Sequence, residues 1–343
     1  MMRTIWALVA MTLVSGALAP VARAEGGTLV VTSSNAASNR LLVYDAQGVL
    51  LASLPTGGQG GVGGNAGGIA TAGGAVAVVN FGSVDVSIFR VQGAGLAFQQ
   101  MVATQSAPVS VAFGKDHLYM LGTTTVESHR LGAAWVDPDP DGVSELSRGD
   151  GSSAQVGILG DQLLVTEKSG AVEQVGLRGG VVSGPATEIE NPPGSDTPLG
   201  LVTRGANGYV TIAHSDQIAL VKNGAVQAIV TTGTNFPSGP GQQAPCWLAL
   251  VGPYLFSSNS PSHTISRLLA TGARIQLDVP EAAHTGGAPT DIAATADRLA
   301  VIEANGSGLS HLTQFTYDDD GTLAQVATSA IAGSANGVVL LEY

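Results

Sequence analysis

The chain has 343 residues, of which only 14 are Lys or Arg, and its formal net charge at pH 7 is −12. Nucleic acid and anionic lipid both bind basic surfaces, so we expect neither as a partner. The single cysteine, Cys246, excludes an intramolecular disulfide and a cysteine-based zinc site.

The first residues have the layout of a secretory signal peptide. Arg3 supplies the positive start, residues 5–19 form a short apolar run, and residues 22–24 (Ala-Arg-Ala) fit the small-x-small cleavage pattern. We therefore predict that residues 1–24 are a signal peptide and that residues 25–343 are the folded domain. The product is expected to be periplasmic or secreted, with no membrane association after cleavage.

The rest of the chain repeats one layout, clearest at residues 245–267, and shows no amphipathic helix. Each copy contains a short apolar run, a turn, a second apolar run, a polar loop and an alternating strand. The copies start roughly 40 to 48 residues apart, which is the spacing of four-stranded propeller blades. Their first residues are Ala66, Pro108, Ser153, Pro198, Pro245 and Pro289.

The copy that starts at Ala66 divides into four predicted strands, at residues 68–72, 75–80, 84–91 and 96–104. The two inner strands are continuous apolar runs, which indicates burial on both faces. The outer strands alternate between apolar and polar residues, which indicates one solvated face. Glycine-rich residues 57–68 are expected to form a loop on the upper face of the propeller.

A seventh blade is split between the two ends of the chain. Residues 28–32, 40–45 and 49–55 read as three strands without an inner strand, and apolar residues 337–343 supply the missing one. Pairing these segments removes two exposed sheet edges. The sequence therefore predicts an all-β protein, a seven-bladed β-propeller whose ring is closed by pairing the C-terminal strand with the N-terminal strands.

Several phrases, in this order, resemble the lactonase-type seven-bladed propeller family of 6-phosphogluconolactonases and carboxymuconate-lactonizing relatives. They are GGNAGGIA followed by VVNFGSVDVSIFRV, then SAPVSVAF, DTPLGLV, APCWLAL with SSNSPSHTISR, and GAPTDIA with YDDDGTL. The resemblance covers residues 25–343 and implies a propeller with a site near the central opening. Enzymes of this family carry a His-rich segment in the middle of the chain, where this sequence reads QVGILG and PLGLVT.

The second apolar run of five copies ends 14 residues after the copy starts, so its last residue should occupy the same place in each blade. These residues are Asn80, Gly122, Glu167, Asn259 and Glu303. We read the copy at Pro198 as longer and place His214 at this point. Since rotation about the axis relates successive blades, we expect these residues to form a ring around the central channel on one face.

This ring supplies the candidate site residues. Glu167 and His214 are candidate general bases, and Arg204 is a candidate partner for an anionic substrate. The remaining three, which carry hydrogen-bonding side chains, are candidate ligand-binding residues: Asn80, Asn259 and Glu303.

We expect neither a metal nor a cofactor. Asp137, Asp139 and Asp141 precede Gly142 as in the first half of a calcium loop, but Arg148 stands where that loop needs a bidentate Glu. We interpret the segment as an acidic surface turn. The histidines show no zinc-binding spacing.

Two functions remain open at this point. The first is an exported lactonase-like enzyme that hydrolyses or binds a small sugar or muconate-type lactone at the channel face. The alternative is a non-catalytic propeller that acts as a protein- or glycan-binding scaffold. The acids of the ring support the first function, and the missing His-rich segment supports the second.

Overall fold

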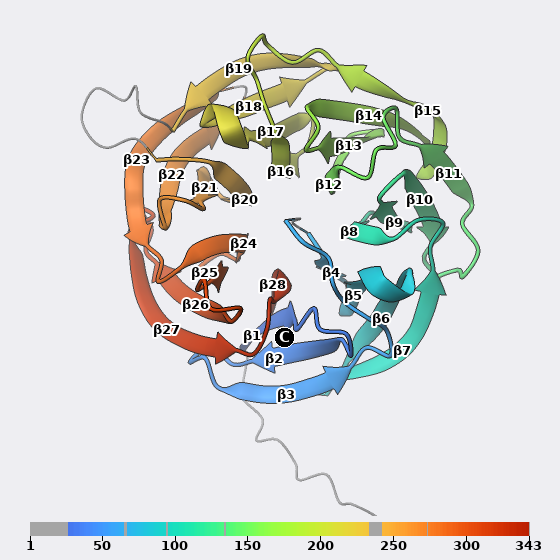
Figure 1. The fold of residues 1–343 in the computed structure, drawn as a ribbon, viewed down its shortest axis with the longest axis horizontal. Helices are drawn as coiled ribbons and strands as arrows, with labels where there is room; N and C mark the ends of the chain where they lie inside the picture. Colours follow the sequence, from blue (N-terminus) through green and yellow to red (C-terminus); the bar gives the residue numbers. More distant parts are fainter. Residues whose placement is uncertain are drawn as a thin grey trace, which may run out of the picture.

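The protein consists of seven four-stranded antiparallel sheets arranged in a ring (Figure 1). The computed structural model describes residues 27–64, 67–93, 95–133, 135–232, 242–272 and 274–342. The predicted signal peptide lies outside these residues. No helix within the described ranges has both the length and the apolar character needed to cross a membrane. The prediction of an all-β, seven-bladed propeller is confirmed.

The strands of each blade follow one another from the axis outward. Blade 1 contains β28 (Asn336–Glu342), β1 (Thr28–Ser33), β2 (Arg40–Tyr44) and β3 (Leu50–Pro55). Blade 2 contains β4 (Ile69–Ala72), β5 (Ala75–Asn80), β6 (Asp85–Gln92) and β7 (Gly95–Ala103). Blade 3 contains β8 (Pro108–Phe113), β9 (His117–Gly122), β10 (Thr125–Arg130) and β11 (Gly142–Glu145).

The second half of the ring repeats this order. Blade 4 contains β12 (Ser153–Leu159), β13 (Gln162–Glu167), β14 (Ala171–Arg178) and β15 (Val181–Ile189). Blade 5 contains β16 (Pro198–Arg204), β17 (Asn207–Ile212), β18 (Gln217–Lys222) and β19 (Ala225–Thr231). Blade 6 contains β20 (Pro245–Val251), β21 (Tyr254–Asn259), β22 (Thr264–Thr271) and β23 (Arg274–His284). Blade 7 contains β24 (Ala288–Ala294), β25 (Arg298–Ala304), β26 (Ser310–Tyr317) and β27 (Leu323–Ile331).

Short 3₁₀ turns follow the second strand in two blades. They are η1 (Phe81–Ser83) in blade 2 and η2 (Ala213–Ser215) in blade 5.

Blade 1 closes the ring as the sequence predicts. The C-terminal strand β28 pairs antiparallel with β1, with Val338 opposite Thr32 and Leu340 opposite Val30. Val338 and Leu340 are buried. The strand β28 therefore completes the backbone hydrogen bonding of blade 1, and its apolar side chains complete the core between the first and last blades.

The antiparallel order of the strands gives the ring two different faces. On the linker face lie the segments that join the outer strand of one blade to the inner strand of the next, together with the turns between second and third strands. On the turn face lie the turns between first and second strands and between third and fourth strands. Every inner strand begins at the linker face and ends at the turn face.

Burial follows the position of a strand within its blade. All six residues of β5 are buried, because a second strand is covered by the neighbouring blade on each side. In β7, on the outside of the ring, buried and exposed residues are mixed. Hydrogen bonds also join successive blades: the hydroxyls of Thr166 and Thr211 donate to the carbonyls of Leu199 and Cys246 in the next blade.

Candidate functional site

The strand register tests which residues occupy the predicted ring. Ser153 pairs with Glu167, Pro245 with Asn259, and Pro289 with Glu303, so these three copies align as expected.

The placement of His214 was wrong. Pro198 pairs with Ile212, so the fifth copy has the same 14-residue step and Ile212 occupies the ring position. His214 lies two residues further on, in η2, with 69% of its side chain exposed on the linker face. Its Nδ1 lies 2.8 Å from the Thr197 hydroxyl.

The ring residues lie between blades, with no exposed surface. Asn80, Glu167, Asn259 and Glu303 are each 0% exposed. These residues lie at the ends of the second strands of their blades, and neighbouring blades cover both faces of a second strand. The expectation that their side chains line an open channel is therefore corrected.

Asn80 shows what a residue at this position does instead. Its Nδ2 donates to Asp85 Oδ1 and Ser87 Oγ, each at 2.7 Å. Its Oδ1 accepts from Thr56 Oγ1 at 2.8 Å and from Asn39 Nδ2 at 2.9 Å. Thr56 follows the outer strand of blade 1, so its hydrogen bond to Asn80 holds the linker between blades 1 and 2 in place. All its hydrogen-bonding capacity is used within the fold.

Buried acids hold the linkers of other blades. The Gly287 N–H donates to Glu303 Oε2 at 3.0 Å, and the Gln105 N–H donates to Glu127 Oε1 at 2.7 Å. Burial raises the pKa of Glu303. Glu127 was not singled out from the sequence. Its acidic side chain in a third strand, at the position of Glu173 in the next blade, was the available signal.

Asn259 makes its contacts within its own blade. Its Nδ2 donates to Ser266 Oγ at 2.8 Å and to Thr264 Oγ1 at 3.2 Å. The Nδ2 group of Asn259 is therefore engaged by the fold, whereas its buried Oδ1 has no hydrogen-bond partner among the described residues.

Glu167 and Glu173 form a buried pair of carboxyl groups on β13 and β14, and both are 0% exposed. Burial, the charge of Glu173 and a hydrogen bond with Glu173 raise the pKa of Glu167 to about 8. Glu167 is therefore mostly protonated at neutral pH. The Ser147 N–H, from the linker between blades 3 and 4, donates to Glu173 at 3.1 Å. This linker covers the pair.

Arg204 lies at the opposite end of its blade from the ring. It is the last residue of β16 and pairs with Asn207 at the turn face, whereas Pro198 and Ile212 pair at the linker face. Its Nη1 donates to the Ala270 carbonyl of blade 6 at 3.4 Å. Arg204 therefore cannot assist Glu167 or His214 in one site, which corrects the expected grouping.

Near the linker face, hydrogen bonds join inner strands of different blades around the central channel. The buried Asp291 carboxyl on β24 accepts from the backbone N–H groups of Ile292, Gly67 and Val338. Burial raises the pKa of Asp291 to about 7. In Figure 1 the segment leading into β4 runs through the middle of the ring.

Similar bonds link blades 3, 4 and 5. Ser110 Oγ accepts from the Val156 N–H at 3.3 Å, and Gln155 Oε1 accepts from the Leu201 N–H at 2.6 Å.

At the turn face, the ends of β8, β12, β16 and β20 line a cavity of about 310 Å³. The residues that line it include the apolar Phe113, Ile158, Leu201, Val202 and Leu250. We call this cavity the channel mouth.

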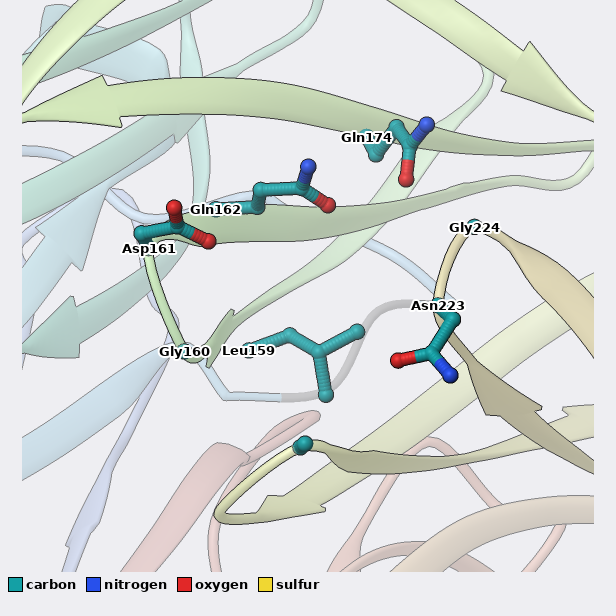
Figure 2. A pocket seen from close by; sticks show the side chains of 8 residues that line it. Leu159, Gly160, Asp161, Gln162, Gln174, Asn223 and Gly224 are labelled. Carbon is teal, nitrogen blue, oxygen red and sulfur yellow. The ribbon is translucent and has the colours of Figure 1, made fainter.

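Three further cavities lie between blades on the turn face. They occupy about 410 Å³ between blades 2 and 3, about 390 Å³ between blades 3 and 4, and about 250 Å³ between blades 4 and 5. Figure 2 shows the third of these. The hollows described in this structure are therefore on the face opposite the predicted ring.

The acidic turn uses Asp141 to hold its own loop. Ser128 Oγ lies 2.7 Å from one Asp141 oxygen, and His117 Nε2 lies 2.9 Å from the other. Burial opposes ionisation, but these hydrogen bonds lower the pKa of Asp141 below its usual value. Across the described ranges, no three His, Cys, Asp or Glu residues are grouped as metal ligands.

Comparison with solved structures supports the predicted resemblance at the level of the fold. A proposed 6-phosphogluconolactonase of Bacteroides fragilis has a TM-score of 0.66 and 14% identity, with 94% of this chain and 100% of that chain covered. The corresponding protein of Bacteroides uniformis has a TM-score of 0.66 and 13% identity, with 92% and 99% covered. A functionally unknown protein of Desulfotomaculum acetoxidans has a TM-score of 0.63 and 11% identity, with 92% and 98% covered.

No protein-family model and no curated protein matches the chain. The protein is thus a lactonase-like propeller in fold. At these identities the likeness transfers no activity, because one fold can carry many functions.

Proposed function

We propose that this protein is an exported, lactonase-like propeller that binds a protein partner through its turn face and does not hydrolyse lactones. The observation that carries the proposal is the separation of the candidate catalytic groups. Glu167 is covered by a linker, His214 is exposed on the linker face, and Arg204 is on the turn face. A general base must lie within hydrogen-bonding reach of the water that it activates, in the same site as the substrate.

The channel mouth is the part of the surface best suited to a partner. Its volume of about 310 Å³ can accept one large apolar side chain, and four inner strands hold its walls in place. Lys115, Asp116 and Asp161, at the ends of neighbouring strands, place both signs of charge on this face. A partly apolar pocket with a polar surround is typical of the centre of a protein interface.

Lactone hydrolysis is the second candidate because of the Glu167 and Glu173 pair. Two neighbouring buried carboxyl groups, one of them with a pKa raised to about 8, are typical of acid–base sites. Such a role requires the linker between blades 3 and 4 to move, since it covers both side chains.

Hydrolysis of a lactone releases acid, so a pH-stat assay with a panel of sugar and muconate-type lactones tests catalysis. We expect the wild-type protein, Glu167→Gln and His214→Ala all to match the buffer. Turnover by the wild-type protein that Glu167→Gln abolishes would establish the hydrolase instead.

Partner binding is tested with peptides selected from a displayed random library against the wild-type protein. We expect the selected peptides to share a large apolar residue and to lose at least tenfold in affinity to Val202→Asp and Ala112→Glu. The matched control is Gln99→Asp, an exposed position on β7, which should bind as the wild type does. Equal affinity for all variants, with melting temperatures unchanged, would refute the channel mouth as the docking site.

A further inference from the structure

The cavity between blades 4 and 5 combines free polar side chains with an apolar floor. Figure 2 shows Asp161 and Gln162 on one side, Asn223 on the other, and Leu159 between them. Gln174 also lines the cavity, which has a volume of about 250 Å³. This volume is below the roughly 300–1,000 Å³ of sites for drug-sized ligands, so it suits one small ring.

The polar groups of this cavity are not used by the fold. Over the part of the chain that the structure describes, Gln174 Oε1 is buried without a hydrogen-bond partner. In the same described part, no hydrogen bond to the side chains of Asp161, Gln162 or Asn223 is present. A buried amide oxygen without a partner costs free energy, which a ligand hydroxyl can recover.

The cavity between blades 3 and 4 provides the contrast, since rotation about the axis relates the two. There His117 is bound to Asp141 at 2.9 Å, and the Tyr119 hydroxyl donates to the Gly180 carbonyl at 2.7 Å. Ser128, equivalent to Gln174, is also bound to Asp141. His117 and Ser128, at the positions of Gln162 and Gln174, are thus both engaged by Asp141, although His117 Nδ1 is buried without a partner among the described residues.

The chemistry of the open cavity suits a neutral polyhydroxylated ring. Amide side chains offer a donor and an acceptor side by side, and a carboxylate accepts two hydrogen bonds, which matches neighbouring hydroxyl groups. Among the described residues that line the cavity, Asp161 is the only charged one, and its negative charge disfavours anionic ligands. Leu159 offers an apolar surface for the C–H groups of the ring.

We infer that the cavity between blades 4 and 5 is a binding site for a single neutral sugar unit, held by Asp161, Gln162, Gln174 and Asn223. The site goes beyond the proposed partner binding and does not depend on it. The hairpin turn at Asn223 and Gly224, with φ of 53° and 70°, forms one wall from blade 5, while the other wall belongs to blade 4. A bound sugar therefore contacts both blades.

Saturation-transfer NMR with glucose, galactose, mannose and N-acetylglucosamine tests the site, with glucose 6-phosphate as an anionic probe. We expect at least one neutral sugar to bind the wild-type protein and glucose 6-phosphate to bind more weakly. Asp161→Ala and Gln174→Leu should each weaken binding by about tenfold, the effect of losing one hydrogen bond to the sugar. Asn223→Gly, which keeps the positive φ of the turn, should weaken it as well.

The matched control is Asp116→Ala, which alters the equivalent acid in the cavity between blades 3 and 4. It should leave sugar binding unchanged. The inference is overturned if no neutral sugar binds, or if Asp161→Ala and Gln174→Leu, with wild-type melting temperatures, bind the sugar as tightly as Asp116→Ala does.

Discussion

Two regions on opposite faces of this ring use their polar side chains differently. On the linker face, Asn80 and Glu173 hydrogen-bond to the chain segments that pass between blades. In the cavity between blades 4 and 5, on the turn face, Gln174 Oε1 is buried without a partner among the described residues. Polar residues near a channel are therefore poor guides to a site until their partners are known.

The difference has a topological origin. Each linker carries the chain from the outside of one blade to the axis of the next, and its buried backbone groups need partners. The turns on the other face are short hairpins that satisfy their own hydrogen bonds. Some side chains near them, such as Asn223, make no hydrogen bond within the described chain, and substitutions in the two regions should have different consequences.

The largest effect is expected from deleting residues 337–343, which removes most of β28, a strand that runs from one face of the ring to the other. The deletion exposes β1 and the inner face of its neighbours, and it removes the buried side chains of Val338 and Leu340. We expect aggregation or loss of the cooperative unfolding transition. Thermal unfolding followed by circular dichroism checks this. Glu342→Ala, at an exposed position of the same strand, is the control. Equal melting temperatures for the deletion and the full chain would contradict the closure.

Asp291→Ala should be the most damaging single substitution near the linker face. It leaves the N–H groups of Gly67 and Val338 buried without their acceptor, which costs about 3 kcal/mol in unfolding free energy. Urea unfolding at pH 6 measures the loss. Asp297→Ala, which alters an acid with 65% of its side chain exposed on the turn face, should change stability by less than about 0.5 kcal/mol. Similar losses for the two variants would remove the contrast between the faces.

Glu167→Gln should make stability less dependent on pH. The pKa of Glu167 is raised from 4.5 to about 8 in the folded protein, so folding favours the protonated form. This stabilisation is complete below pH 4.5 and is lost as pH rises through about 8. Gln keeps a donor and cannot ionise, so the variant should exceed the wild type at pH 8 by on the order of 2 kcal/mol.

Urea unfolding between pH 5 and pH 9 measures this difference for Glu167→Gln. Glu188→Gln, which alters an exposed acid paired with Arg148 at 3.0 Å, is the control and should follow the wild-type pH profile. A gap between Glu167→Gln and the wild type that stays constant with pH would show that Glu167 is ionised throughout.

Substitutions that remove polar side chains from the cavity between blades 4 and 5 should leave the stability of the protein nearly unchanged. Asp161→Ala and Asn223→Gly remove side chains that make no hydrogen bond within the described chain. Differential scanning calorimetry of the double variant should give a melting temperature within a few degrees of the wild type, equivalent to about 1 kcal/mol or less. A much larger drop would mean that these side chains are structural, like those on the linker face.

The smallest effect is expected from removing metal ions. On the turn face, the Asp141 carboxyl is already engaged by Ser128 and His117, which leaves little capacity for calcium. EDTA should therefore not change the melting temperature. A drop of several degrees on adding EDTA, absent in Asp139→Asn, would show that the acidic turn binds a cation.

The sequence by itself determined the blades and the closure of the ring. Apolar runs, alternating strands and the 14-residue step recur locally, so a strand such as β5 could be bounded correctly at residues 75–80. The split blade followed from the apolar C-terminal run. All these features depend on the period of a segment and on its neighbours in the chain.

The environment of each polar residue was decided only by the tertiary structure. Glu167 meets Glu173 beneath a linker, Asp291 reaches Gly67 across the ring, and Gln174 faces a hollow formed by the next blade. The pattern of a strand predicts whether a residue is buried or exposed. The hydrogen-bond partners of that residue come from other blades and linkers that pack beside the strand. The ring was therefore predicted where the repeat placed it, whereas the cavity between blades 4 and 5 lies on the other face, between two blades that only the tertiary structure brings together.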